Sequence, residues 1–486
     1  MTYRFIDVRQ FYGISHEGVP RAPHASPRTL PESNHSEDWL AAVILPRMRF
    51  GRLLIAAVVT GMAFCAGSAP AQMPTEAWRA KIRHTLYVPD KLPALHAKVW
   101  STFSPVPGVL ADRVTYSTAD GMLVPAVVYR PDPKVTRYKG KLPGLVVVNG
   151  HGSDKFGWYA FYSGLMFAKA GAVVVTYDPI GEGERNAERR SMQNPSPHDA
   201  DINPPAPLPH EDWGQHLAGL MQVDLMQAVS YLDAQPEVDP ARIGVLGYSM
   251  GSFVAGITGA IDPRIHAVLL SGGGTFDDDT GYFDHGNKPC QSSPYHALAK
   301  VLQIDGNPAR GILLYDLNDQ RGPMYVMNGQ ADSVMDIAHH DAAWFETMHT
   351  RLLAFNDKVI PANAFTNIIY PGISHRPSWV NRDGVHWLNA QLHFAFWDTD
   401  AKIDAQGTTH VSKWITDNHV AISPNYFRED REGGLDAVGT GLPAIARADL
   451  MVLPDADWRR LKDQLIYEAW AAKTLAAENA QVATSK

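Results

Sequence analysis

Short apolar runs alternate with longer periodic segments through the middle of this 486-residue chain. The runs are apolar on consecutive residues, and this is typical of strands that are covered on both faces of a parallel sheet. They end at Gly152, Gly181, Ser249, Gly273, Asp332 and His375. Residues 214–235 lie between two of these runs and repeat apolar residues on one broad helical face. The pattern predicts an α/β fold with a mostly parallel central sheet and helices on both faces.

The regions on either side of this alternation have other patterns. Residues 73–105 predict one or two helices, and two strand-like runs joined at Asp120-Gly121 follow them. Near the other end, residues 455–479 have an amphipathic pattern with Asp455 as a candidate N-cap, which predicts one long helix packed back on the domain. The expected organisation is an N-terminal helical segment over 72–112, an α/β domain over 113–400 and a C-terminal extension over 401–486.

The N-terminal region resembles the leader of an exported protein. Arginines precede the apolar run 53–64, and small residues follow it up to Ala71. This order predicts a secretory signal peptide cleaved after Ala71, and the run is too short to span a bilayer comfortably. Because signal peptides begin at the initiator methionine, we expect translation to start at Met48, with a signal peptide over 48–71 and a disordered upstream extension over 1–47. A buried N-terminal helix is the alternative.

The composition narrows the choice of class and partner. Hydrophobic residues make up 45% of the chain and charged residues 19%, as in a globular protein. The formal charge of -8, with no basic block, argues against a nucleic-acid partner. Cleavage after Ala71 would leave Cys290 as the single thiol of a periplasmic or secreted protein, with no disulfide within one chain and no membrane partner in the mature form.

One serine has the sequence surroundings of a nucleophile. Ser249 lies in the G-x-S-x-G stretch "GYSMG", after an apolar strand and before a helix that opens with small residues. A sharp strand-to-helix turn of this kind exposes a serine above the sheet, and the two glycines permit close backbone approach. A serine hydroxyl still needs a base and a group that orients the base. An ordinary strand-to-helix turn is the alternative reading.

Four motifs resemble those of a known superfamily. "VVVNGHG", "VVTYDPIGEGE", "VDPARIGVLGYSMG" and "VMNGQADSVMD" occur in the order found in α/β-hydrolases. The resemblance covers roughly residues 113–397 and is strongest to the dienelactone hydrolase-like and acetyl xylan esterase-like serine esterases. It implies a nucleophile, an acid and a histidine in that order: Ser249, then Asp332 with Asp336 in reserve, then His375. His386 is expected to be structural.

The resemblance also implies donors for an oxyanion. The backbone N–H of the residue after the nucleophile, Met250, is expected to be the first. The turn "NGHGSDKFG" resembles the family's oxyanion turn, so a second N–H is expected from Gly152 or Ser153. His151 in that turn is then expected to be structural.

Two other motifs contain residue types that occur in cofactor or metal sites. The stretch "YDPIGEGER" lacks the dinucleotide fingerprint, so Asp178 is expected to fix a loop beside the site. The charged pair Glu184-Arg185 ends this stretch, at a place where many members of the family that the chain resembles carry a small residue. Residues 339–341, His-His-Asp, lack a supporting metal motif and are expected to form a solvated helix start. No cofactor and no metal are therefore expected.

Together these features predict a secreted serine carboxylesterase that acts through an acyl-enzyme on small-molecule or polysaccharide esters, acetyl xylan being one example. A serine peptidase of the prolyl oligopeptidase type and a non-catalytic binding protein are the alternatives. The loop 186–213 is expected to be a lid or a plain surface insertion. Aromatic residues that follow the oxyanion turn are either a sugar-facing wall or buried core: Trp158, Tyr159, Phe161 and Tyr162.

Overall fold

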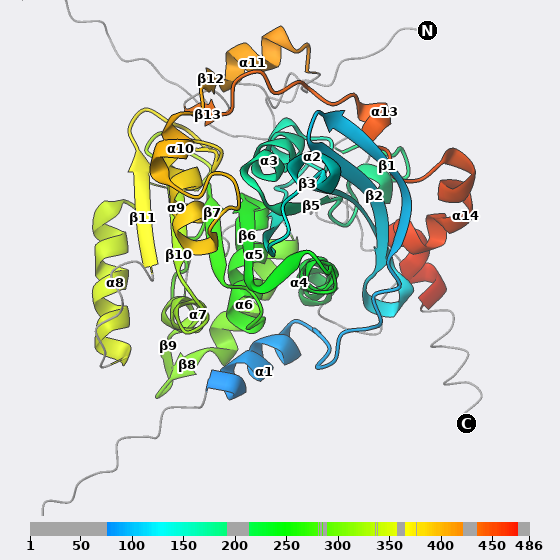
Figure 1. Cartoon of the computed structure of the whole chain (residues 1–486). Coiled ribbons are helices and arrows are strands. Elements are labelled where there is room, and N and C mark those ends of the chain that lie inside the picture. The colour runs from blue at the N-terminus through cyan, green and yellow to red at the C-terminus, as the bar shows by residue number, and fades with distance from the viewer. Residues whose placement is uncertain are drawn as a thin grey trace, which may run out of the picture. The chain divides into compact units, whose positions relative to one another are not determined.

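A nine-stranded mixed sheet forms the centre of the compact unit Ser68–Lys486 (Figure 1). The strand order is β1-β2-β3-β5-β4-β6-β7-β10-β11. The strands are β1 Lys98–Val106, β2 Val109–Ser117, β3 Leu123–Pro131, β4 Leu142–Val148, β5 Val173–Tyr177, β6 Val238–Tyr248, β7 Ala267–Ser271, β10 Met324–Gly329 and β11 Phe365–Tyr370. β1, β2 and β3 pair antiparallel, as do β3 and β5, and every pairing from β5 to β11 is parallel. This is the α/β-hydrolase fold that the sequence predicts.

The computed structural model describes part of the chain. The described residues are 75–191, 213–279, 281, 284, 289–335, 337, 339–356, 365–375, 377–420 and 435–474. The predicted signal peptide and the upstream extension lie outside them, as do Asp336 and most of the loop 186–213.

Each face of the sheet has its own hydrophobic core. Along β4, Val146 and Val148 contribute to one core, whereas Leu145 and Val147 contribute to the other. This division follows from the two-residue period of a strand, and it explains why the sequence runs are apolar on consecutive residues.

The helices divide between the two faces. Residues of α1 and of α4 to α8 join the first core, and residues of α3, α9 and α11 join the second. The helices of the main domain are α1 Thr75–Thr85, α2 Pro133–Thr136, α3 Trp158–Ala170, α4 Trp213–Asp233, α5 Met250–Ile261, α6 Pro289–Val301, α7 Arg310–Asp319, α8 Ala342–Asn356, α9 Arg382–Leu392 and α10 Asp400–Asp404. Within the described residues, no helix combines the length and the hydropathy that a bilayer crossing needs.

The predicted helical segment over 72–112 is wrong beyond α1. Residues 98–106 form the edge strand β1, which pairs with β2 and has irregular register at two points. The reason is that an edge strand buries little: most of β1 is exposed or half-buried, so its sequence lacks the apolar run that marks the central strands. The two strands predicted around Asp120-Gly121 are β2 and β3, joined by a short 3₁₀ turn at Ala119–Gly121.

The C-terminal region is less helical than predicted. Its described elements are α11 Val411–Asp417, α13 Arg447–Leu450, α14 Asp455–Leu465, a further helical stretch over 467–474 and a small hairpin of β12 Thr408–His410 with β13 Asp436–Val438. The single helix predicted over 455–479 is interrupted at Ile466, whose backbone is extended. After this break, the side chains of Tyr467 and Trp470 pack in the first core.

Candidate active site

Ser249 lies at the sharp turn between β6 and α5. Its backbone has φ 53° and ψ −116°, a conformation that a residue with a side chain rarely adopts. The N–H of Ser249 donates to the carbonyl oxygen of Ser271 at the end of β7, with a distance of 3.0 Å. The half-buried serine is therefore held in a strained position at the carboxyl end of the sheet.

The two glycines of G-x-S-x-G are required by close backbone contacts. A Cβ atom added to Gly247 would lie 2.3 Å from the carbonyl oxygen of Gly251. A Cβ atom added to Gly251 would lie 2.2 Å from the carbonyl oxygen of Val148 in β4. Because both obstacles are backbone atoms, no rotation of a side chain relieves them, and α5 can start this close to the sheet only with glycine at these positions.

We expect Gly251→Ala to lower the free energy of unfolding by about 1–3 kcal/mol, since the new methyl group overpacks the turn. The same variant is expected to lower the reactivity of the Ser249 hydroxyl, because Ser249 moves with the turn. Urea unfolding followed by circular dichroism measures the first effect. Gly306→Ala is the control: Gly306 has φ 78° with no atom near its added Cβ, so it reports backbone strain alone. Equal losses in both variants would contradict the overpacking argument.

The structure brings together the three side chains predicted for nucleophile, base and acid. His375 Nε2 lies 3.0 Å from Ser249 Oγ, and His375 Nδ1 lies 2.8 Å from Asp332 Oδ2. Both His375 and Asp332 are buried. An imidazole placed in this way can accept a hydroxyl proton at one nitrogen, while a carboxylate orients it at the other.

Parallel strands explain why residues so far apart in sequence meet. Ser249 follows β6, Asp332 follows β10 and His375 follows β11, so all three leave the same edge of the sheet. The acid is fixed further, because Asp332 Oδ1 accepts the N–H groups of Val334 and Met335 at 2.8 Å and 3.1 Å. The acid and histidine loops are also joined through their main chains, for the N–H of residue 331 donates to the carbonyl of residue 373 at 2.8 Å.

The predicted second oxyanion donor needs correction. The N–H of Gly152 donates to Glu182 Oε1 at 3.1 Å, and the N–H of Ser153 donates to the carbonyl of Gly150 at 3.3 Å. Both N–H groups therefore already donate within the protein, one to a residue outside the turn and one inside it, a detail that the sequence motif cannot show. Gly150 of the turn packs against the nucleophile, since a Cβ added to it would lie 3.1 Å from Ser249 Cβ. Met250 directly follows Ser249 and is the first residue of α5.

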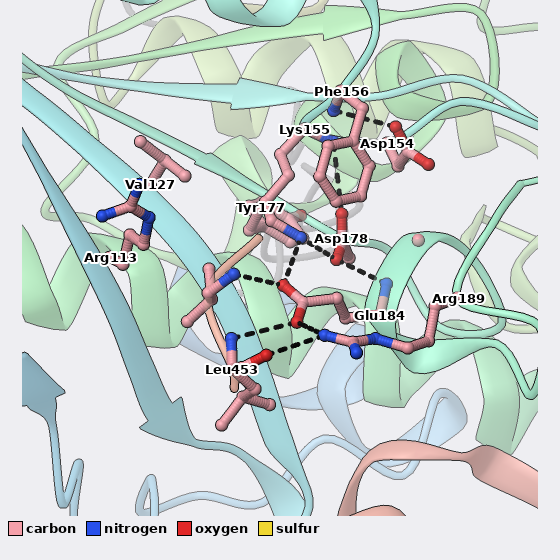
Figure 2. A network of polar contacts seen from close by, with 12 residues as sticks. Arg113, Val127, Asp154, Lys155, Phe156, Tyr177, Asp178, Glu184, Arg189 and Leu453 are labelled. Carbon is pink, nitrogen blue, oxygen red and sulfur yellow. Dashed lines mark hydrogen bonds and ion pairs between the residues drawn. The ribbon is translucent and has the colours of Figure 1, made fainter. Parts of the chain in front are cut away.

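Asp178 lies behind this turn, in the structural role that the sequence suggests. Its carboxylate accepts the N–H of Lys155 at 3.2 Å and the N–H of Glu184 at 2.8 Å, and it pairs with the Lys155 ammonium. Figure 2 shows the Lys155 side chain directed between Asp178 and Glu184. All three side chains are fully buried. The sequence singled out Asp178 but gave no signal that Lys155 is its partner.

We expect the stability cost of Glu184→Gln to depend on pH. Burial raises the pKa of Glu184, but the Lys155 charge and the N–H groups of Val452 and Leu453 outweigh it, so the pKa lies below the usual 4.5. A carboxyl whose pKa is lower in the folded protein stabilises it above pH 4.5 and loses that effect as pH falls through the folded pKa.

The free energy of unfolding of Glu184→Gln should therefore be roughly 3 kcal/mol lower than that of the wild type at pH 7, where a buried ion pair is broken. The gap between the two proteins should narrow below pH 4.5. Urea unfolding of both proteins from pH 7 to pH 3.5 measures this. A gap that stays constant or widens in acid would contradict it.

The remaining sequence candidates have structural places. His386 hydrogen-bonds Asp400 and Asp404, each at 2.9 Å, on the outside of α9, so it is structural as expected. His340 is buried and lies 2.9 Å from Asp277, so the expectation of a solvated helix start is wrong for this histidine. Among the described residues, no group of three or more His, Cys, Asp or Glu side chains could hold a metal ion. Of the two readings left open for the aromatic residues after the turn, buried core is confirmed, because all four are buried in α3: Trp158, Tyr159, Phe161 and Tyr162.

Comparisons with known proteins match this part of the chain. Residues 210–401, which include all three side chains of the candidate site, match the family model described as "Prolyl oligopeptidase family". The thiohydrolase apmlB of Arthrinium phaeospermum is 28% identical over 160 residues, which are 33% of this chain and 42% of that protein. The matched region thus spans less than half the length of the curated relatives.

Solved structures with a related arrangement include methylesterase BT1017, with 17% identity and a TM-score of 0.48 over 68% of this chain and 66% of that chain. Acetyl xylan esterase 1 from Thermoanaerobacterium sp. JW/SL YS485 has 17% identity and a TM-score of 0.42, and covers 65% of this chain and 92% of that chain.

Proposed function

We propose that this chain is a serine carboxylesterase of the α/β-hydrolase superfamily. One observation carries the proposal: Ser249 Oγ, both ring nitrogens of His375 and the Asp332 carboxylate form a continuous hydrogen-bonded chain with distances of 3.0 Å and 2.8 Å. Activation of a serine hydroxyl by a base, itself oriented by an acid, is the requirement for acyl transfer.

In the proposed mechanism, His375 Nε2 takes the proton from Ser249 as its Oγ attacks the ester carbonyl carbon. The Asp332 carboxylate holds the Nδ1 proton and stabilises the imidazolium that forms. His375 then gives its proton to the leaving alcohol, and an acyl group remains on Ser249. Water attacks the acyl-enzyme with His375 again as base, which releases the acid and restores the serine.

The tetrahedral oxyanion is proposed to rest on the N–H of Met250 and on the peptide between Gly150 and His151. Support for the first is its position at the start of α5, immediately after the nucleophile. Support for the second is that Gly150 is the residue of the turn packed against Ser249. Donors of this kind contribute about 2.7–4 kcal/mol each to the transition state.

Acyl esters of plant polysaccharides, acetyl xylan among them, are the proposed substrates together with smaller esters. The motif resemblance to acetyl xylan esterase-like enzymes supports this choice. We also propose that the protein is periplasmic or secreted, on the strength of the basic residues, the apolar run 53–64 and the small residues up to Ala71. N-terminal sequencing of the exported protein tests the predicted start at Met48 and cleavage after Ala71, and a product that retains residues before Met48 would overturn that start.

Peptide hydrolysis is the second candidate, because the matching family model is that of prolyl oligopeptidases. A panel of p-nitrophenyl acyl esters, acetylated xylan and chromogenic proline peptides separates the two, with the Ser249→Ala protein as the blank. Ester turnover above peptide turnover, absent in the blank, is the expected result. Peptide turnover above ester turnover would replace the esterase proposal with a peptidase. Ester turnover unchanged in the blank would refute Ser249 as nucleophile.

A further inference from the structure

The segment 447–458, here called the C-terminal clamp, packs its main chain against a buried carboxylate next to the candidate site. The N–H groups of Val452 and Leu453 donate to the two oxygens of Glu184 at 2.7 Å and 3.0 Å. The indole N–H of Trp458 donates to the Glu184 carbonyl at 2.8 Å. Arg189 adds a bridge, since its guanidinium lies 2.8 Å from both Glu184 Oε1 and the Leu453 carbonyl (Figure 2).

From Glu184 the contacts continue to the oxyanion turn. Glu184 Oε2 lies 2.8 Å from Lys155 Nζ, and Asp178 holds Lys155 through both its ammonium and its backbone N–H. Burial alone lowers the pKa of Lys155, but the charges of Asp178 and Glu184 outweigh it and raise the pKa. The ammonium therefore stays charged, and it needs both carboxylates because charges out of contact with water are costly unless they are paired.

The clamp also reaches the turn directly. The guanidinium of Arg447 lies over the ring of Phe156 at 3.7 Å from its centroid, and Lys155 Nζ lies over the same ring at 4.0 Å. Two residues before Glu184, the Glu182 carboxylate accepts the N–H of Gly152. The stretch 149–156 is a glycine-rich turn without regular secondary structure. Contacts of Gly152, Lys155 and Phe156 help to fix its position, beside those of Asn149 and Asp154, and the contacts of Lys155 and Phe156 involve Glu184 or the clamp.

We propose that the C-terminal clamp positions the oxyanion turn, with Glu184 and Lys155 as the positioning residues through which it acts. The inference rests on the proposed function, since it assigns a role in acyl transfer to residues that do not touch the reacting atoms. Misplacement of a catalytic group by about 1 Å can cost about 100-fold in rate, so a small shift of the turn is enough for a measurable effect.

A matched pair of tryptophans tests the proposal in the full chain. Trp458 and Trp470 each donate one indole N–H to a backbone carbonyl, of Glu184 at 2.8 Å and of Asp120 at 3.1 Å. Of the two, Trp458 is the one that lies in the clamp and binds Glu184, through the Glu184 backbone carbonyl. We expect Trp458→Phe to lower kcat for p-nitrophenyl acetate roughly tenfold with KM unchanged, and Trp470→Phe to leave both near wild type. Glu184→Gln should lower kcat about 10- to 100-fold, provided that circular dichroism shows a folded protein.

The rate at which a fluorophosphonate labels Ser249 supplies a second readout that does not depend on the carboxylic substrate. It should fall in Trp458→Phe and Glu184→Gln but not in Trp470→Phe. Wild-type kcat and labelling rate in folded Trp458→Phe would overturn the clamp proposal and leave the esterase proposal standing. Equal losses in both tryptophan variants would also overturn it, because they would reflect packing alone. A wild-type protein that neither labels nor hydrolyses esters would refute the proposed function and the clamp proposal with it.

Discussion

Ser249→Ala is expected to lower kcat for ester hydrolysis about 10⁴- to 10⁶-fold while the fold is retained. The loss is large because the acyl-enzyme route needs a serine oxygen as nucleophile, and the substitution removes the hydroxyl that lies 3.0 Å from His375 Nε2. Steady-state hydrolysis of p-nitrophenyl acetate measures the effect, with fluorophosphonate labelling as a direct probe of the serine.

The matched control is Ser252→Ala in the next turn of α5. Ser252 Oγ donates to the Ser249 carbonyl at 2.6 Å, so its loss removes a nearby hydroxyl without removing the nucleophile. A tenfold effect or less is expected there. If the two variants lost activity equally, the special role assigned to Ser249 would have to be given up.

Asp332→Asn is expected to lower kcat about 10⁴-fold with little loss of stability. The amide oxygen of asparagine can still accept the N–H groups of Val334 and Met335, so the loop keeps its anchors. The amide NH₂ then faces His375 Nδ1, 2.8 Å away in the native protein, and donates to it. This arrangement leaves the proton on Nε2, where the imidazole can no longer take one from Ser249.

The pH profile separates this explanation from simple disruption. In Asp332→Asn the imidazole of His375 is held in the wrong tautomer. Activity should therefore recover partly at high pH, where hydroxide can replace the general base. Asp341→Asn, just before α8, is the control and should behave as wild type, because the Asp341 carboxylate accepts the N–H of Trp344 at the start of that helix and not a histidine. Wild-type kcat in Asp332→Asn would exclude Asp332 as the orienting acid and turn attention to Asp336.

The central sheet and the three side chains of the site could be predicted because both leave local signals. Strands covered on both faces must be apolar on consecutive residues, and a serine at a tight strand-to-helix turn needs glycine at fixed positions on either side. Asp332 and His375 each follow a strand, so once the strands are placed in one parallel sheet, the side chains share an edge. Their proximity in the structure follows from that topology.

What could not be predicted depends on partners distant in sequence. β1 is an exposed edge strand without an apolar run, so the pattern gave helix. Gly152 and Ser153 carry N–H groups that resemble oxyanion donors by motif, yet the Glu182 carboxylate and the Gly150 carbonyl receive them. No period or motif reports such a choice of acceptor. Likewise, nothing near Glu184 in the sequence indicates that its carboxylate is bound by residues 452 and 453.

That long separation has a consequence for biosynthesis. Lys155, Asp178 and Glu184 are synthesised hundreds of residues before residues 452 and 453, whose N–H groups donate to the Glu184 carboxylate. A nascent chain that already contains Ser249, Asp332 and His375 therefore still lacks the last donors of this charged cluster. Full maturation of the hydrolase must wait until translation has passed residue 453.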